Sequence, residues 1–147
     1  MNSVIVFDAL RKGYNSVNEI IDYAKSLGNS ISKKTVLRQI NTLCDLGYDV
    51  QKRENSWFIE GKIKTRGQYL VENIKPPALK PSAYPVLILH ILEGCESFYL
   101  DQEDIISFLH VDYRCKLTRQ AVSRSIEGLR KLGYHIEHTK EGYKLIR

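Results

Sequence analysis

The clearest pattern of apolar and polar positions lies in residues 33–46, where apolar side chains recur at helical spacing. They are four and three residues apart: Val36, Ile40 and Leu43. Such spacing gathers them on one face of a helix. Ser32 can cap the free backbone N–H groups at its start, and Gly47 can end it in a left-handed conformation. We therefore predict a helix over Lys33–Leu46.

Two shorter helices are predicted before this one, and a β-hairpin after it. The helices are expected over Ser3–Lys12 and Val17–Leu27, and the strands over Val50–Arg53 and Ser56–Ile59. Ser16 and Glu19 have the spacing of a capping box at the start of the second helix. Glu54 and Asn55 form the turn between two segments of alternating pattern, as in a hairpin. The first half therefore predicts three helices followed by a hairpin.

The second half repeats the first. Residues 31–60 align with residues 117–146 at a constant offset of 86, without a gap. Seven aligned positions are identical: Val36/Val122, Arg38/Arg124, Ile40/Ile126, Leu43/Leu129, Leu46/Leu132, Gly47/Gly133 and Tyr48/Tyr134. Two copies are too few for a solenoid, so we interpret the chain as a tandem duplication of one domain.

The elements of the second repeat follow from the same signals. Helices are expected over Ser82–Glu93, Asp101–Val111 and Arg119–Leu132, and a hairpin over His135–Thr139 with Tyr143–Ile146. A short strand over 98–100 is a further possibility before the second of these helices. The predicted organisation is a first domain at 1–62, a linker at 63–81 and a second domain at 82–147.

The linker is basic and contains prolines. Residues 75–81 include Pro76, Pro77 and Pro81, which favour an extended and fairly stiff chain. The segment Thr65–Asn73 fits either a short helix or a strand, and the pattern does not decide between them.

Charge and cysteine content narrow the function classes. The net charge is +5, which favours an anionic partner. Residues 1–62 hold 9 Lys and Arg against 7 Asp and Glu, whereas residues 82–147 hold 9 against 9.

The three cysteines are widely spaced, which indicates a reducing, cytoplasmic setting and no metal site. We expect Cys44 to pack beside the apolar stripe of its helix. The absence of a signal-peptide pattern or a long apolar stretch predicts no membrane contact.

The third helix of each repeat places polar side chains opposite its apolar stripe, where a duplex major groove could receive them. Lys and Arg bind phosphates, and Arg, Asn and Gln also make paired hydrogen bonds to bases. In the first repeat the candidate DNA-binding residues are Ser32, Lys33, Lys34, Leu37, Arg38, Asn41, Lys52 and Arg53. In the second they are Thr118, Arg119, Gln120, Ser123, Arg124 and Lys140. The second set is less basic, because Glu127 stands where the first repeat has Asn41.

The segment LTRQAVSRSIEGLRKLGYHIEHTKEGYKL resembles the winged helix-turn-helix of the biotin repressor and of WYL-domain and DeoR-like transcriptional regulators. ISKKTVLRQINTLCDLGYDV is similar, with a more divergent hairpin. The resemblance covers residues 1–60 and about 82–147. It implies a mainly α fold with small β-hairpin wings (α+β), in two tandem winged helix-turn-helix domains. It also implies that Ser32–Arg38 and Thr118–Arg124 enter the major groove. The catalytic and effector-sensing domains of those regulators are not carried over.

These observations predict a sequence-specific regulator of transcription that binds double-stranded DNA, and we expect a repressor. Two recognition helices on one chain can read groove segments about 34 Å apart. No nucleophile–base motif, phosphate loop or catalytic carboxylate pair is found, so we expect neither an enzyme nor a cofactor. Two alternatives stay open. One is a protein-interaction scaffold similar to chromosome-partitioning accessory subunits, with a homodimer or a protein partner bound through the second domain. The other is a plasmid or phage replication initiator.

Overall fold

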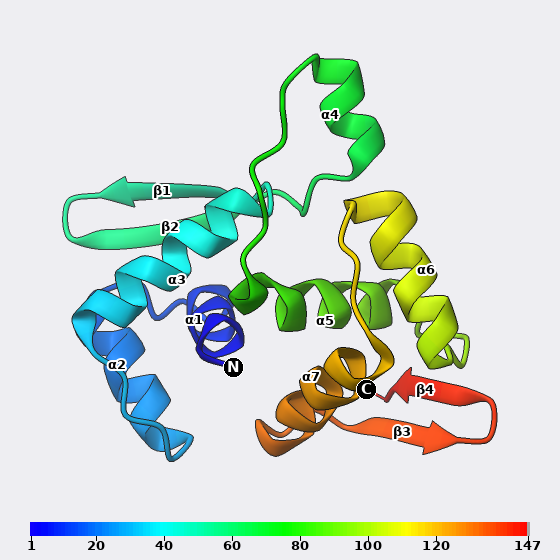
Figure 1. Cartoon of the computed structure of the whole chain (residues 1–147). Coiled ribbons are helices and arrows are strands. Elements are labelled where there is room, and N and C mark those ends of the chain that lie inside the picture. The colour runs from blue at the N-terminus through cyan, green and yellow to red at the C-terminus, as the bar shows by residue number, and fades with distance from the viewer. Residues whose placement is uncertain (147) are drawn as a thin grey trace. The chain divides into compact units, whose positions relative to one another are not determined.

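A computed structural model describes residues 1–146 of the 147-residue chain and shows a mixed α+β protein with two small antiparallel hairpins (Figure 1). The chain forms two compact units. Unit 1 comprises Met1–Lys64 and Pro77–Ala83, and unit 2 comprises Thr65–Pro76 and 84–146. The segment 63–81 that the sequence assigns to a linker is thus divided between the two units.

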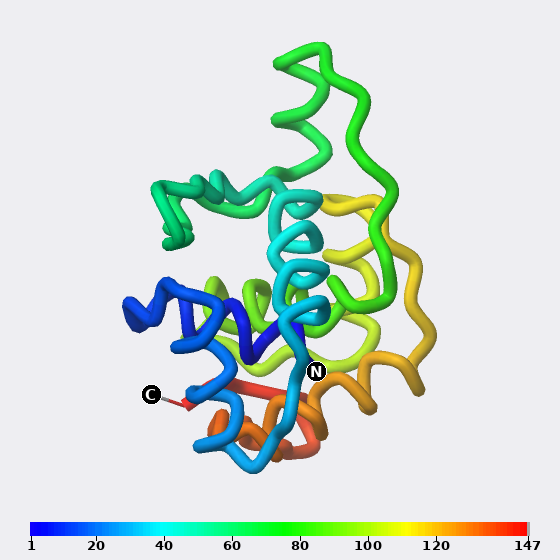
Figure 2. The backbone as a smooth tube through the Cα atoms, turned by 90° about the vertical axis from the view of Figure 1, so that its left-hand side faces the viewer, coloured from blue at the N-terminus to red at the C-terminus, as the bar shows by residue number. Residues whose placement is uncertain are grey.

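Unit 1 has the predicted order of three helices and a hairpin. Its elements are α1 (Asn2–Arg11), α2 (Val17–Ser26), α3 (Lys33–Asp45), β1 (Asp49–Arg53), β2 (Ser56–Glu60) and the 3-10 turn η1 (Pro81–Ala83). Figure 2 shows α3 as a column, with α2 beside its start and the hairpin leaving its far end. The helix and strand boundaries lie within one residue of the predicted ones.

Local capping determines where these helices begin. The Ser16 hydroxyl accepts a hydrogen bond from the Glu19 backbone N–H, and the Glu19 carboxylate accepts one from the Ser16 N–H, so the predicted capping box is confirmed. Ser32 caps α3 in the same way, with its hydroxyl accepting from the Thr35 N–H at 3.1 Å. Gly47 follows α3 with a φ of +107°, a conformation that only glycine adopts at little cost.

The core of unit 1 is built around α1, which packs against α2, α3 and β2. Residues 3–10 of α1 are all buried, as expected for a helix that is apolar around most of its circumference. The predicted stripe of α3 meets it: Val36, Ile40 and Leu43 are each at most 1% exposed. The predicted stripe is therefore confirmed. Because the stripe is buried, the opposite face of α3 lies at the surface.

Unit 2 repeats this order. It contains α4 (Arg66–Glu72), α5 (Tyr84–Gly94), α6 (Gln102–Tyr113), α7 (Arg119–Lys131), β3 (Ile136–Thr139) and β4 (Gly142–Leu145). The helix α5 packs against α6, α7 and β4, and the stripe of α7 is fully buried at Val122, Ile126 and Leu129. Asp101 is the N-cap of α6 rather than its first residue, and Thr118 caps α7.

Each hairpin receives one extra pairing from the residues before the second helix of its unit. Ser16 bridges Ser56 in unit 1, and Leu100 bridges Tyr143 in unit 2. The second bridge has two backbone hydrogen bonds, of 2.8 Å and 2.7 Å. The strand expected over 98–100 is thus reduced to one bridging residue.

The segment between the repeats contains a short helix, which settles the alternative left open by the sequence. Thr65 and Gln68 form a capping box at the start of α4, and Asn73 ends it with a φ of +54°. Residues 75–80 have no regular secondary structure. No helix within residues 1–146 has the length and apolar character needed to cross a membrane.

Candidate nucleic-acid interface

The exposed face of α3 is the most basic helix face among the predicted site residues. Positions 34, 37, 38 and 41 share this face, because they are spaced three or four residues apart opposite the buried stripe. Lys34, Arg38 and Asn41 are exposed there, and Leu37 is partly buried. Lys33 is also exposed, in the first turn of the helix. The structure therefore brings together the predicted residues of this helix at one surface.

The charged groups of this face are not neutralised within the described chain. No ion pair or side-chain hydrogen bond to Lys33, Lys34 or Arg38 occurs among residues 1–146. Ser32 differs, since its hydroxyl both accepts from the Thr35 N–H and contacts the Thr35 hydroxyl at 3.1 Å. Two lysines in the first turn of the helix, Arg38 one turn later and the positive end of the helix dipole create a surface that attracts phosphate.

The first hairpin adds two exposed cations. The Lys52 ammonium lies 5.4 Å from the centre of the Trp57 ring on the facing strand, and the Arg53 guanidinium lies 5.3 Å from that of Phe58. These cation–π contacts hold the charged ends beside aromatic rings of the hairpin, although both residues are exposed. The hairpin thus presents its two predicted site residues in defined positions.

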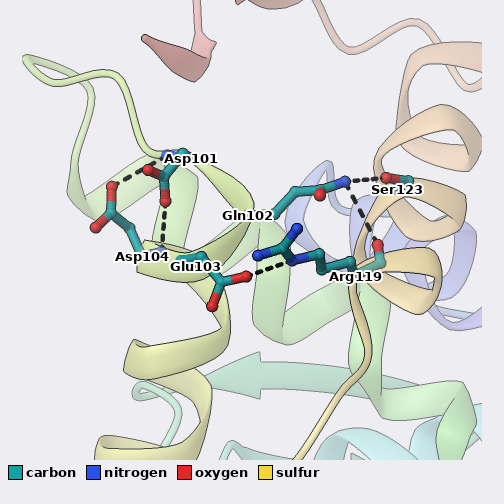
Figure 3. Close-up of polar contacts among 6 residues, drawn as sticks. All are labelled: Asp101, Gln102, Glu103, Asp104, Arg119 and Ser123. Atoms are coloured by element: carbon teal, nitrogen blue, oxygen red, sulfur yellow. Dashed lines mark hydrogen bonds and ion pairs between the residues drawn. The ribbon is translucent and has the colours of Figure 1, made fainter.

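The corresponding helix of unit 2 begins differently, because α6 contacts its first turns (Figure 3). The Glu103 carboxylate forms an ion pair with the guanidinium of Arg119. The Gln102 amide donates a hydrogen bond to the Ser123 hydroxyl and another, of 3.5 Å, to the Arg119 carbonyl. Arg119 and Ser123 are therefore already engaged within unit 2.

The rest of the α7 face carries little net charge. Gln120 and Arg124 are exposed, and the Thr118 hydroxyl caps the helix by accepting from the Ala121 N–H. Glu127, which takes the place of Asn41, pairs with Arg130 at 2.7 Å. The α7 face thus includes a negative charge that the α3 face lacks.

Lys140 lies at the exposed tip of the second hairpin. It borders an open hollow of about 300 Å³ together with Tyr99, Thr139 and Glu141. The Tyr99 hydroxyl donates a hydrogen bond to Glu137, and this bond raises the pKa of the phenol. Lys140 is the one predicted site residue of this hairpin, and Glu141 lines the same hollow.

The sequence did not reveal the role of Gln102 and Glu103, which bind Ser123 and Arg119 in the first turns of α7. Their only signal was the acidic first turn of α6, and acidic residues there also interact favourably with the helix dipole.

The expected packing of Cys44 is wrong, because this residue is exposed. Partial burial and the nearby Asp45 and Asp49 raise the pKa of this thiol, which disfavours the reactive thiolate.

Unit 2 also exposes more apolar surface than unit 1. Its large exposed apolar side chains are Leu70, Val71, Ile74, Phe98, Phe108 and Val111, against Met1 and Tyr14 in unit 1. Three of them belong to α4 and the residues just after it, and two belong to α6, against which α4 packs. Clustered exposed apolar residues of this kind are typical of protein contact surfaces.

Comparison with known proteins returns no matching family model, no matching curated protein and no matching solved structure. Among the described residues, no group of three or more His, Cys, Asp or Glu side chains is arranged to hold a metal ion.

Proposed function

We propose that this chain is a double-stranded DNA-binding regulator of transcription, formed by two winged helix-turn-helix units, in which α3 is the principal recognition helix. The observation that carries the proposal is the row of Lys34, Arg38 and Asn41 on one exposed face of a capped helix, with Lys33 beside it. The helix packs against α2, and a hairpin with two exposed cations follows it. This layout is the one with which winged helices approach DNA.

The charges fit each part of such a complex. A cation at the start of α3 can bind a phosphate, while Arg38 and Asn41 lie one and two turns further along and can reach base edges in the major groove. Lys52 and Arg53 are placed to bind the backbone beside the groove. Because phosphate contacts release counterions, affinity should fall steeply as salt rises.

A fluorescence anisotropy titration against DNA selected from a random pool tests the proposal. We expect the Lys34→Ala/Arg38→Ala variant to lose at least about tenfold in affinity near 0.1 M salt, with a shallower salt dependence. The control is Lys25→Ala/Lys62→Ala, which removes two exposed cations elsewhere in unit 1 and should change affinity much less. Wild-type binding no tighter than about 10⁻⁶ M, the nonspecific range, or equal losses in both variants would overturn the proposal.

A second candidate function is favoured by the exposed apolar residues of unit 2. We propose that two of them, Phe108 and Val111, form a homodimer contact on the exposed face of α6. Asp104 lies near the start of this helix, Phe108 and Val111 are on the same exposed face, and Arg114 follows its end. Two α6 helices packed antiparallel about a two-fold axis would pair each acidic start with a basic end across an apolar centre.

Light scattering coupled to size exclusion tests this second candidate. We expect a dimer whose dissociation constant rises at least tenfold in Phe108→Glu. Phe98→Glu is the control, because Phe98 is exposed but lies outside α6. A monomer at 100 micromolar, or a dimer that is equally stable in Phe108→Glu, would contradict it.

A further inference from the structure

The first turn of α7 is held by two side chains of α6, and this contact involves the residues that would reach DNA. Arg119 and Ser123 are both predicted site residues, and they bind Glu103 and Gln102, respectively. Asp101 and Asp104 lie in the same turn of α6, but they form its capping box: each carboxylate accepts a hydrogen bond from the other residue's backbone N–H. Glu103 is therefore the carboxylate of this turn that is directed at α7 (Figure 3).

Unit 1 has no equivalent of this contact. Counted from the N-cap, the residues of α2 that correspond to Gln102 and Glu103 are Val17 and Asn18. Neither carries a charge, and Lys33, the counterpart of Arg119, has no ion pair among the described residues. The two units thus differ in one feature at the start of the recognition helix: an acidic partner is present in unit 2 and missing in unit 1.

We propose that Glu103, supported by Gln102, is an intramolecular competitor of DNA that lowers the affinity of α7 for phosphate. This inference rests on the proposed function. A phosphate at the start of α7 must displace the Glu103 carboxylate from Arg119 or remain close to it and be repelled. Gln102 adds to the effect, because it occupies the Ser123 hydroxyl one turn further along.

The competitor is weak enough to be displaced. The side chains of Arg119 and Glu103 are 69% and 60% exposed, and exposed ion pairs of this kind contribute little to stability. Unit 2 therefore engages DNA after unit 1 has bound, once the covalent connection raises its local concentration at the duplex. The ion pair makes unit 1 the anchor and unit 2 the subordinate contact.

The test compares Glu103→Gln with the wild-type full chain in the anisotropy titration described above. Glutamine keeps the side-chain shape and removes the charge. We expect affinity to rise about two- to fivefold at low salt, the range that an exposed ion pair allows. We also expect the log–log salt slope to steepen by up to about 0.9, because Arg119 then contacts phosphate in every complex and not only where phosphate has displaced Glu103. A merely structural role would shift the melting temperature and leave this slope unchanged.

Two further variants separate competition from a general change in charge. In an Arg119→Ala background, Glu103→Gln should no longer increase the affinity more than the control Glu60→Gln, which removes an exposed carboxylate of unit 1. Conversely, Asn18→Glu should create the same kind of contact in unit 1, between the new carboxylate and Lys33. It should weaken DNA binding by a similar factor.

The outcomes distinguish this inference from the proposed function. If the wild type binds DNA through Lys34 and Arg38 but Glu103→Gln changes neither affinity nor slope, the competitor is refuted and the proposed function stands. The competitor is also refuted if Glu103→Gln increases the affinity for DNA by the same factor in the Arg119→Ala background. If the wild type does not bind DNA, the proposed function fails, and this inference fails with it.

Discussion

The two units share one fold but present different surfaces. Among the seven positions that are identical between the repeats, three pairs are buried in both units: Val36/Val122, Ile40/Ile126 and Leu43/Leu129. Charge has diverged, since unit 1 holds 11 Lys and Arg against 7 Asp and Glu, whereas unit 2 holds 11 against 10. Core packing therefore accounts for these three shared pairs, while the two units differ in surface charge.

One shared residue does not fit the explanation from packing. Arg38 and Arg124 are identical and exposed in both units. An exposed position has no packing reason to keep the same side chain while its neighbours Lys34 and Gln120 differ. A common contact outside the unit, such as one to a phosphate or a guanine edge, explains it better. If the proposed function holds, this arginine is the contact to DNA that both units would share.

The largest effect is expected at Gly142 in the second hairpin, where unit 1 has Ser56. The φ of Gly142 is +129°, and a Cβ atom there would lie 2.4 Å from the backbone carbonyl of Leu100. We expect Gly142→Ala to lower the free energy of unfolding by about 4 kcal/mol, because of strain and the lost bridge. Ser56→Ala should cost less than about 1 kcal/mol.

Urea unfolding followed by circular dichroism measures both changes. Trp57 is the only tryptophan of the chain and belongs to β2, so its fluorescence separately follows unit 1. Equal losses in the two variants would show that the hairpins are built alike, contrary to the bridge geometry.

A second contrast concerns the thiols of Cys44 in unit 1 and Cys115 in unit 2. Cys115 is 4% exposed, and burial raises its pKa to about 11 from an ordinary value of 9.0. The folded state therefore binds this proton more tightly. Its contribution to stability is complete below about pH 9 and is lost as the pH rises towards 11.

Alkylation with iodoacetamide at pH 8, mapped by mass spectrometry, tests this contrast. The raised pKa leaves about a hundredfold less thiolate at Cys115 than an ordinary thiol would have. Burial also keeps the reagent from Cys115, so the exposed Cys44 should react faster in the folded protein even though its own pKa is raised. The difference should largely disappear in urea. Fast labelling of Cys115 under native conditions would mean that unit 2 opens locally and is less stable than unit 1.

The glycines that follow α3 and α7 also differ in their surroundings. Both have positive φ, but a Cβ on Gly47 would lie 2.7 Å from the backbone nitrogen of Lys64, whereas a Cβ on Gly133 would meet nothing within 4 Å. Gly133→Ala should cost about 1 kcal/mol from backbone strain alone. Gly47→Ala should cost about 1–2 kcal/mol more, because Lys64 donates to the Leu46 carbonyl at 3.0 Å and must move. Thermal unfolding of the two variants gives the difference directly, and equal losses would contradict the close approach.

Local signals explain why most of the fold could be predicted from the sequence. Ser16 and Ser32 cap helices through atoms three residues away, and the apolar stripes of α3 and α7 lie within a single element. The helix α4 stayed ambiguous because it buries none of its residues, so no apolar face marked its period. Cys44 adjoins the stripe of α3 in sequence, but its side chain points to solvent.

The candidate site could likewise be predicted only where its features are local in sequence. The exposure of Lys34 and Arg38 follows from helix period, which the sequence contains. The engagement of Arg119 by Glu103 does not, because it joins residues 16 positions apart on two helices. Only the packing of α6 against α7 brings them together.

The smallest effects are expected in DNA binding, when Lys33→Ala is compared with Arg119→Ala at the same position of α3 and α7. Lys33 has no acidic partner in the described chain, so its removal should cost one full phosphate contact, about three- to fivefold in affinity and about 0.9 in the salt slope. Arg119 must first leave Glu103, so its removal should cost less than about twofold. Anisotropy titrations at several salt concentrations measure both quantities, with melting curves as the control for folding. A loss in Arg119→Ala as large as that in Lys33→Ala would show that Glu103 releases its partner completely in the complex, and the two units would then be equal partners on DNA.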